Sequence, residues 1–236
     1  MEIKVLRNIL EANEAIAAEN RRQFDQHNLY VVNLLASPGA GKTSLLERTL
    51  EGLRGELAMA VIEGDIAGRL DAERIARHGV PVLQINTGGT CHLDANMIRR
   101  ALGEMSLEGL DLLFIENVGN LVCPAEFVLG EDAKVTVWSV AEGDDKAEKY
   151  PRVFLESQAL VINKTDLLDL TDFDLERARR SALALNPRLT IFALSCRTGE
   201  GLAGWLDWLR AQVNGRRARR DTSSEPRLSR CATPSP

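Results

Sequence analysis

The chain has 236 residues, of which 44% are hydrophobic, 27% charged and 5% aromatic, values typical of a soluble globular protein. This length allows one well-packed α/β domain and leaves little for a second. The net charge is −5, but the last 23 residues carry +4 and the rest carries −9. An acidic body argues against general nucleic-acid binding.

The sequence shows no sign of a membrane-spanning or secreted protein. No apolar run reaches the roughly 18 residues that a membrane helix requires. The opening segment MEIKVLRNIL mixes charges with apolar residues, unlike a secretory signal peptide. We therefore expect a cytoplasmic protein with no membrane partner. In that reducing setting, the four cysteines favour metal binding or burial over disulfides.

The hydrophobic pattern predicts strands and helices in alternation. The first element is an amphipathic helix, predicted by the helical spacing of apolar residues over 5–27. Short continuous apolar runs then predict seven buried strands, at residues 29–36, 57–62, 82–85, 110–115, 135–140, 159–162 and 189–194. Helical patterns lie between most of them, at residues 44–53, 69–77, 93–102, 172–185 and 201–212.

This alternation predicts an α/β fold with a mostly parallel central sheet and helices on both faces. We expect three parts. Residues 1–28 form an N-terminal amphipathic helix packed on the core, and residues 29–213 form the α/β domain. Residues 214–236 are rich in Arg, Ser and Pro without periodicity, so we interpret them as a disordered basic tail.

The segment ASPGAGKT, between the first predicted strand and a helix, is similar to a P-loop. It matches G-x-x-x-x-G-K-[ST] except that Ala36 replaces the first glycine. In such loops backbone N–H groups bind phosphate, the lysine neutralises phosphate charge, and the hydroxyl binds Mg²⁺. The alternative is a tight glycine turn without a ligand. We assign phosphate binding to Gly39, Ala40, Gly41, Lys42, Thr43 and Ser44.

A second motif, NKTD, follows a predicted strand and is similar to the N-K-x-D signature of GTPases. The Asp166 carboxylate can accept hydrogen bonds from guanine N1–H and its 2-amino group, a pair that adenine lacks. Asn163 and Lys164 complete the motif. Ser195 and Cys196 begin SCRTGEG, which resembles the loop that packs under the base. Alone, NKTD is equally compatible with a helix-capping turn, but its place downstream of a P-loop favours guanine.

Two strand ends carry acids that suit a nucleotide switch. Glu116 and Gly119, in FIENVGN, occupy the place of a D-x-x-G motif, where the glycine N–H meets the γ-phosphate. Asp65, in VIEGDIAG, is a candidate for orienting Mg²⁺ or water. The alternative is that both acids are solvated loop residues. We name Lys42, Asp65 and Glu116 as catalytic candidates, and Thr43 and Asp65 as magnesium ligands.

Two cysteines and a histidine form a candidate metal site. Cys91 and His92 are adjacent, so they can share a metal only on irregular backbone, which Gly88 and Gly89 provide. Cys123 follows another strand, and strand-end loops of α/β sheets meet at one edge. Three such ligands suit Ni²⁺ or Zn²⁺ and leave one position open, which favours transfer or sharing across a dimer. The alternative is two buried structural cysteines and a loop histidine.

Seven segments together resemble the HypB family of hydrogenase nickel-incorporation GTPases: ASPGAGKTSLL, VIEGD, NTGGTCHLDA, FIENVGNLVCPAEF, YPRVF, NKTDLL and GEGLAGWLDWL. The resemblance covers roughly residues 1–212. It implies a SIMIBI-class P-loop GTPase that forms a GTP-dependent homodimer and helps deliver Ni²⁺ to the [NiFe]-hydrogenase large-subunit precursor. It also implies a zinc-containing accessory partner of the HypA type.

The resemblance assigns roles to matching residues. It implies a nickel or zinc site at the dimer interface, formed by Cys91, His92 and Cys123. The nucleotide and magnesium residues would be Lys42, Thr43, Asp65 and Glu116. Asp166 would recognise guanine. Some members hold nickel in an N-terminal cysteine cluster or histidine-rich stretch. Residues 1–28 here contain no Cys and only His27, so we expect no nickel store there.

We therefore interpret the chain as a metallochaperone whose P-loop domain, residues 29–213, binds GTP and GDP. Slow GTP hydrolysis is expected because no general base or arginine finger is evident in the sequence. Two alternatives stay open. One is a related P-loop metallochaperone GTPase for another metalloenzyme, and the other is a nucleotide-dependent dimerisation module with structural cysteines.

Overall fold

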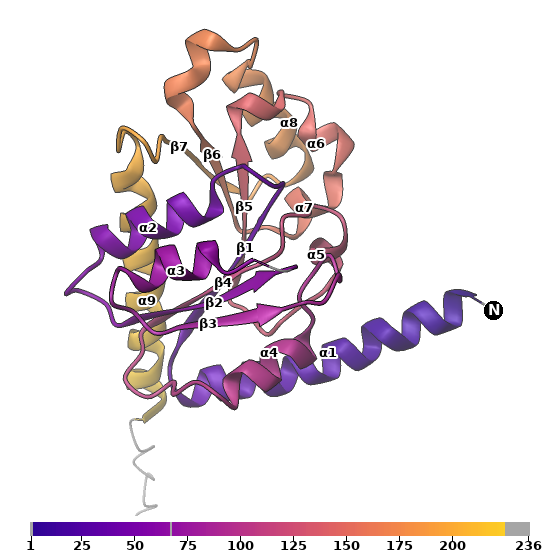
Figure 1. The fold of residues 1–236 in the computed structure, drawn as a ribbon, viewed down its shortest axis with the longest axis vertical. Helices are drawn as coiled ribbons and strands as arrows, with labels where there is room; N and C mark the ends of the chain where they lie inside the picture. The colour runs from indigo at the N-terminus through magenta and orange to yellow at the C-terminus, as the bar shows by residue number, and fades with distance from the viewer. Residues whose placement is uncertain (1, 67, 225–236) are drawn as a thin grey trace, which may run out of the picture.

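Seven parallel strands form the centre of the computed structural model, which describes residues 2–66 and 68–224 (Figure 1). The strands are β1 (Tyr30–Ala36), β2 (Met59–Asp65), β3 (Val82–Asn86), β4 (Leu112–Glu116), β5 (Ala133–Ser139), β6 (Ala159–Asn163) and β7 (Thr190–Ala193). Their order across the sheet is β3-β2-β4-β1-β5-β6-β7, and every pairing is parallel. The predicted fold class is confirmed, and each predicted apolar run overlaps one strand.

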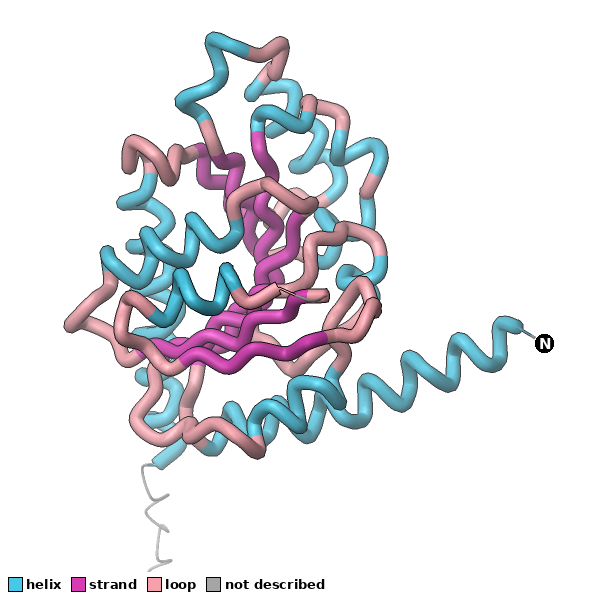
Figure 2. The backbone as a smooth tube through the Cα atoms, in the orientation of Figure 1, coloured by secondary structure: helices cyan, strands magenta, loops and turns pink. Residues whose placement is uncertain are grey.

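Helices connect the strands and cover both faces of the sheet (Figure 2). They are α1 (Glu2–Gln26), α2 (Lys42–Gly52), α3 (Leu70–Ala76), α4 (Ala95–Leu102), α5 (Cys123–Glu126), α6 (Lys146–Lys149), α7 (Pro151–Glu156), α8 (Leu175–Leu185) and α9 (Leu202–Ser224), with 3₁₀ turns η1 (Val140–Glu142) and η2 (Thr165–Leu170). Helices α5, α6 and α7 were not predicted, because pieces of four to six residues are too short to show a helical period. Within the described ranges, no helix has the length and apolarity needed to cross a bilayer.

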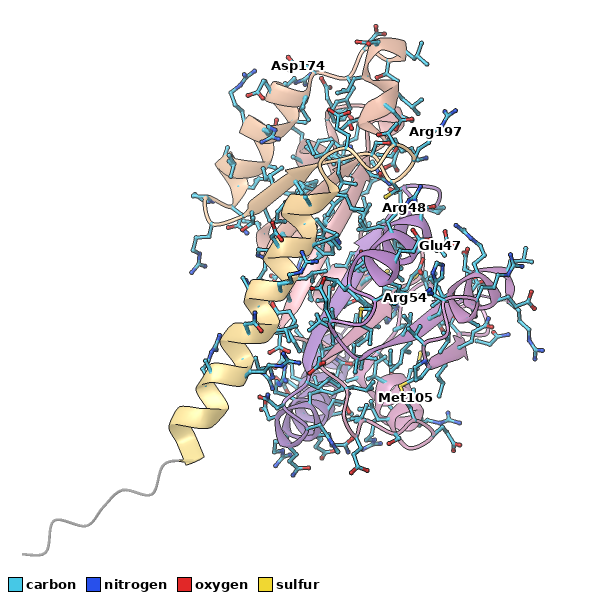
Figure 3. The ribbon with its side chains drawn as sticks, turned by 90° about the vertical axis from the view of Figure 1, so that its left-hand side faces the viewer. Glu47, Arg48, Arg54, Met105, Asp174 and Arg197 are labelled. Atoms are coloured by element: carbon cyan, nitrogen blue, oxygen red, sulfur yellow. The ribbon has the colours of Figure 1, made fainter. Side chains whose placement is uncertain are left out.

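The central strand β1 is buried on both sides. Alternate side chains of a strand point to opposite faces. Val32 and Leu34 pack in a core shared with α2 and α9, and α9 lies along that face (Figure 3). On the opposite face Val31 packs with residues of α1 and α4, and Leu35 packs with residues of α7 and α8. Burial on both faces explains why this strand is continuously apolar rather than alternating.

Helix α1 is attached to the domain by two asparagines. The side-chain amide of buried Asn20 donates to the carbonyl oxygens of Ala95 (2.9 Å) and Leu129 (3.0 Å). The Asn13 amide donates to the Val128 carbonyl (2.8 Å) and accepts from the Ala95 N–H (2.8 Å). These bonds fix the helix against the start of α4, whereas its N-terminal half projects past the sheet (Figure 1).

The parallel register brings the functional loops to one edge of the sheet. Leu34 of β1 is level with Glu116 of β4, and Glu116 is level with Glu63 of β2. All strands run in the same direction, so the loops that follow them leave from their carboxyl ends, where α/β proteins bind ligands. The predicted phosphate, switch, metal and base residues therefore share this edge.

The prediction of a disordered tail over residues 214–236 is wrong for its first part, because α9 continues to Ser224. Residues 225–236 lie outside the described residues. The predicted helix ended at residue 212 because the apolar period stops there. Tertiary ion pairs, which leave no periodic signature in a sequence, hold the helix beyond that point.

Those ion pairs join α9 to three acids. Arg216 donates to Asp132 (Nη1 to Oδ1, 2.8 Å) and also pairs with Asp25 at the end of α1. Arg217 pairs with Asp111 just before β4 (Nη2 to Oδ1, 2.5 Å). The Arg216 and Asp132 side chains are only 16% and 14% exposed, so this pair is better shielded from solvent than an ordinary surface ion pair.

We predict that Arg216→Ala lowers the free energy of unfolding by about 1–3 kcal/mol, because it removes one of the two arginines that pair with the shielded Asp132 carboxylate, the other being Arg21. The matched control is Arg179→Ala, which removes a 3.9 Å contact to the exposed Glu176 and should change stability by less than about 0.5 kcal/mol. Urea denaturation of both variants checks this. Equal losses in the two variants would contradict the role given to Arg216.

Candidate nucleotide and metal sites

The P-loop tolerates alanine in place of its first glycine. Ala36 is the last residue of β1 and is fully buried. Among the described residues, the non-glycines with positive φ are Asn28 and Lys164, so Ala36 has a conformation open to any residue. Gly41 differs: its φ is +101°, and a Cβ there would lie 2.4 Å from the Asn163 amide nitrogen. Glycine is therefore required at position 41 and not at position 36.

A cleft of about 500 Å³ opens beside the P-loop at the N-terminus of α2. Free backbone N–H groups at a helix N-terminus attract phosphate. The predicted residue Ala40 is fully buried and does not line this cleft; its backbone carbonyl accepts from the Asn163 amide (3.0 Å). The cleft is lined by the predicted residues Gly39, Gly41, Lys42, Thr43, Ser44, Asp65, Glu116 and Gly119, and by Glu63, which was not predicted.

Two buried carboxylates face this cleft. The Thr43 hydroxyl donates to Glu116 (Oγ1 to Oε1, 2.9 Å). Glu116 and Glu63 are 4% and 3% exposed, and the Oε2 atom of each has no hydrogen-bond partner within the described residues. Unpartnered buried carboxylate oxygens beside a threonine hydroxyl fit a hard cation such as Mg²⁺. The signal for Glu63 in the sequence is an acid inside the apolar run AVIEG.

The burial of these carboxylates favours their neutral forms. Burial raises the pKa of Glu63 to about 8, and the neighbouring Glu116 adds to the rise. Burial also raises the pKa of Glu116 to about 7, although Lys42 and the Thr43 hydroxyl act in the opposite direction. Both acids therefore hold protons over part of the neutral range until a cation replaces them.

The Asp65 carboxylate lies at the cleft but binds its own loop. Its Oδ1 accepts from the Ile66 N–H (2.6 Å), and its Oδ2 accepts from the Gly68 N–H (2.8 Å). The residue therefore closes a turn just beyond β2. Its magnesium role stays a prediction, and filling that role requires Asp65 to share oxygens that already accept two hydrogen bonds.

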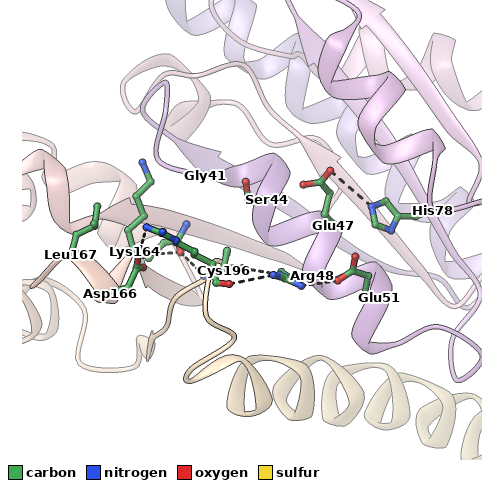
Figure 4. Close-up of a pocket in the computed structure, with 12 residues that line it drawn as sticks. Gly41, Ser44, Glu47, Arg48, Glu51, His78, Lys164, Asp166, Leu167 and Cys196 are labelled. Atoms are coloured by element: carbon green, nitrogen blue, oxygen red, sulfur yellow. Dashed lines mark hydrogen bonds and ion pairs between the residues drawn. The ribbon is translucent and has the colours of Figure 1, made fainter.

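A second pocket, of about 510 Å³, lies between α2 and the loops after β6 and β7 (Figure 4). The Asp166 carboxylate lies at this pocket and accepts from the Ser195 hydroxyl (2.5 Å). Lys164 has a left-handed backbone with φ of +64°, and its ammonium donates to the Gly39 carbonyl (2.7 Å). The lysine thus joins the base pocket to the phosphate cleft.

Two further side chains hold the loop after β7 against this pocket. The Asn163 amide oxygen accepts from the Cys196 N–H (3.2 Å). Arg48 of α2, which was not predicted, donates from Nε to the Cys196 carbonyl (2.7 Å; Figure 4). Burial raises the pKa of the Cys196 thiol to about 11, so this residue contributes through its backbone rather than as a thiolate. The structure brings together Asn163, Lys164, Asp166, Ser195 and Cys196.

Cys91, His92 and Cys123 converge within one chain. The two Sγ atoms are 3.3 Å apart, the Cys91 Sγ lies 3.9 Å from His92 Nδ1, and all three ligand atoms lie within 4.8 Å of one another. Gly88 and Gly89 have φ of +62° and +102°, which provides the predicted irregular backbone after β3. The adjacent Cys91 and His92 can therefore face the same point as Cys123, the first residue of α5.

The pKa shifts of Cys123 and His92 are compatible with reversible metal binding. The hydrogen bond with Cys91 raises the pKa of the Cys123 thiol. Burial lowers the pKa of His92, whose ring lies 4.1 Å from the Phe127 ring, although Asp94 acts in the opposite direction. A neutral imidazole can bind metal at once, whereas the thiols must first release protons. Two sulfurs and one nitrogen suit Ni²⁺ or Zn²⁺ and leave a position open.

A strand, a glycine-rich loop and a helix follow one another in a parallel sheet, and a switch-like loop leaves the neighbouring strand. This arrangement defines a P-loop nucleotide-binding protein. Comparison with known families agrees. Residues 30–193 match the family model described as the CobW/HypB/UreG nucleotide-binding domain. The chain therefore belongs to this family.

Relatives place the chain among the HypB proteins of that family. It is 50% identical over 222 residues to the hydrogenase maturation factor HypB of Azotobacter chroococcum, an alignment that covers 93% of this chain and 72% of the relative. It is 47% identical over 204 residues to HypB of Escherichia coli strain K12, an alignment that covers 86% of this chain and 70% of the relative.

Two solved structures agree with that placement. HypB from Helicobacter pylori in complex with nickel superposes with a TM-score of 0.82 at 36% identity, covering 86% of this chain and 96% of the other. HypB from Archaeoglobus fulgidus superposes with a TM-score of 0.81 at 39% sequence identity, covering 86% of this chain and 99% of the other. The resemblance inferred from the sequence motifs is confirmed.

We predict that the metal-free protein loses stability as pH rises from about 5 to about 8. Over this range the folded chain keeps protons on Glu63 and Glu116 that the unfolded chain has released near pH 4.5. The folded state binds more protons, so the free energy of unfolding falls with increasing pH. Urea denaturation at several pH values, without divalent cations, measures the slope.

Glu63→Gln should make this decline shallower, by up to about 1.4 kcal/mol per pH unit, because it removes one titrating proton. Glu108→Gln, at an exposed position, is the matched control and should keep the wild-type slope. The interpretation fails if both variants titrate like the wild type.

Proposed function

We propose that this protein is a GTP-hydrolysing metallochaperone that helps deliver nickel during [NiFe]-hydrogenase maturation. The observation that carries the proposal is the convergence of Cys91, His92 and Cys123 on the sheet edge that also holds the phosphate cleft. The names of the relatives support the hydrogenase part, and the nickel complex of the Helicobacter pylori protein supports the metal.

The phosphate cleft supplies a distinct role for each of its groups. Lys42 neutralises β- and γ-phosphate charge, and the Gly119 N–H binds the γ-phosphate. Thr43, Asp65 and Glu116 would hold Mg²⁺, which when bound neutralises charge on the transferring phosphoryl group. The buried, unpartnered oxygen of Glu116 supports this assignment.

Guanine is the base that the second pocket fits. Asp166 would accept from guanine N1–H and the 2-amino group, while its present partner Ser195 keeps the carboxylate oriented. The backbone of Cys196, held by Asn163 and Arg48, supports the base from below. GTP and GDP are therefore the proposed ligands, bound across both pockets with Lys164 between them.

Slow turnover follows from the state of the arginine at the cleft. Arg74 lines the phosphate cleft, but its guanidinium binds Glu47 (2.5 Å) and Asp71 (3.0 Å). An arginine finger must be free to stabilise charge in the transition state. With Arg74 engaged, positioning and Mg²⁺ carry hydrolysis in the isolated chain.

The open coordination position supports a transfer role. A structural zinc site uses four protein ligands, whereas Cys91, His92 and Cys123 supply three. We infer that GTP promotes a homodimer in which these ligands lie at the interface. A zinc-containing accessory protein of the HypA type would exchange nickel with this site, and the hydrogenase large-subunit precursor would receive it indirectly.

The guanine assignment predicts a switch of base in Asp166→Asn. The Asn oxygen still accepts from Ser195, but its amide now faces the donors of guanine, so GTP affinity should fall by about 100-fold or more. Xanthosine triphosphate has a C2 carbonyl instead of the amino group and should bind the variant better than GTP. Fluorescent-nucleotide competition measures both, and Asp172→Asn, at an exposed position, is the control. Undiminished GTP affinity would contradict the assignment.

The central test is Ni²⁺ affinity and stoichiometry, measured by calorimetry in the GDP state and with a non-hydrolysable GTP analogue. We expect the two affinities to differ by about fivefold or more. The double variant Cys91→Ala/Cys123→Ala should lose nickel binding in both states. Cys231→Ala, which removes a thiol outside the described residues, should keep it. Nickel binding that survives the double variant would refute the proposed site.

A further inference from the structure

The loop after β4 binds the loop that carries Cys91 and His92 through two asparagine side chains. The Asn117 amide oxygen accepts from the Leu93 N–H (3.1 Å), and the Asn120 amide nitrogen donates to the Cys91 carbonyl (3.3 Å). These bonds hold the backbone on both sides of His92. The two asparagines also flank Gly119, which lines the phosphate cleft.

Asn117 is anchored inside the protein. It is 1% exposed, and its amide nitrogen donates to the side-chain oxygen of Asn33 on β1 (3.2 Å). Asn33 is fully buried and in turn donates to Glu131 (3.2 Å). Because the amide of Asn117 is engaged at both ends, it cannot rotate without breaking its bond to Leu93 or its bond to β1.

Asn120 joins the second part of the metal site to the P-loop. Its side-chain oxygen accepts from the N–H of Val122 (3.0 Å), the residue before Cys123. Its backbone forms an isolated antiparallel bridge with Ala36, where β1 ends and the P-loop begins. One residue therefore contacts the strand end before the phosphate site and the backbone beside both cysteines.

Gly119 lies between these two anchors and against the P-loop. A Cβ at Gly119 would lie 3.0–3.1 Å from atoms of Pro38, so the switch loop and the P-loop touch there. Asn117 lies two residues before Gly119 in the chain, and Asn120 follows it directly. A movement of Gly119 towards a γ-phosphate therefore acts on the segment that carries both amide contacts to the Cys91–Leu93 backbone.

We propose that Asn117 and Asn120 are positioning residues that transmit the presence of the γ-phosphate to the Cys91, His92 and Cys123 site. The inference rests on the proposed function, in which that site binds nickel with an affinity that depends on the nucleotide. Neither asparagine binds the metal. Each fixes where the backbone places a ligand, so a change in the switch loop changes the geometry of the three donors.

The quantity to measure is the ratio of Ni²⁺ dissociation constants in the GDP and GTP-analogue states of the full chain. A residue with a merely structural role weakens both states equally and leaves the ratio unchanged, whereas loss of the link brings the ratio towards one. We expect a wild-type ratio that differs from one by about fivefold or more. In Asn120→Ala and Asn117→Ala the ratio should fall to within about twofold of one.

Two more variants complete the design. Asn120→Asp keeps an oxygen for the Val122 N–H but removes the amide donor to the Cys91 carbonyl, and it serves if Asn117→Ala does not fold. Asn86→Ala is the matched control, since this exposed asparagine accepts from Gly88 in the same ligand loop (2.9 Å). Asn86→Ala should keep the wild-type ratio.

The outcomes separate the two proposals. A wild-type ratio of one, or no nickel binding, would reject the proposed function together with this inference. A wild-type ratio that persists in Asn120→Ala and Asn120→Asp would overturn this inference alone. A ratio that collapses equally in Asn86→Ala would also overturn it, because the effect would then belong to the ligand loop and not to its link with the switch.

Discussion

The parallel pairing of β4 with β1 on one side and β2 on the other is the constraint on which both candidate sites depend. It sets Leu34, Glu116 and Glu63 level across three strands. The P-loop, the switch-like loop and the Asp65 loop therefore leave the sheet at the same height. A shift of one residue in the register of β4 would turn Glu116 to the opposite face and away from Thr43.

The same constraint places two acids side by side at the floor of the cleft, where little of either side chain is exposed to solvent. Glu63 and Glu116 lie on adjacent strands with almost no exposure, an arrangement that is unfavourable while both are ionised. The fold accommodates them because burial raises the pKa of both groups. Binding of a cation in this cleft, as proposed for Mg²⁺, would release these protons and change the charge of the cleft.

The sequence was sufficient to predict the architecture, because strands buried on both faces appear as continuous apolar runs. The nucleotide motifs and the Cys91, His92 and Cys123 cluster were also predictable, since the ligands of a parallel sheet gather at its carboxyl edge. The residues that could not be predicted from the sequence act through tertiary contacts. Arg48 donates to a carbonyl of the loop after β7, which lies far along the chain.

Other failures have related physical causes. Glu63 was overlooked because an acid inside a strand reads as an interruption of an apolar run rather than as part of a site. The end of α9 was misjudged because Arg216 is held by Asp132, which precedes β5. Short-range patterns record burial and local capping, but they do not record which distant residue will complete a hydrogen bond or an ion pair.

The exposure of the proposed metal site bears on how an ion would leave it. Cys91 is exposed, and the three candidate donors come from two loops on one edge, so an ion bound by them would be accessible from solvent. If the site binds nickel as proposed, a sulfur or nitrogen from another protein would bind the ion before any of the three ligands departs. Exchange would then be associative, and the ion would pass between the two proteins without release as a free aqueous species.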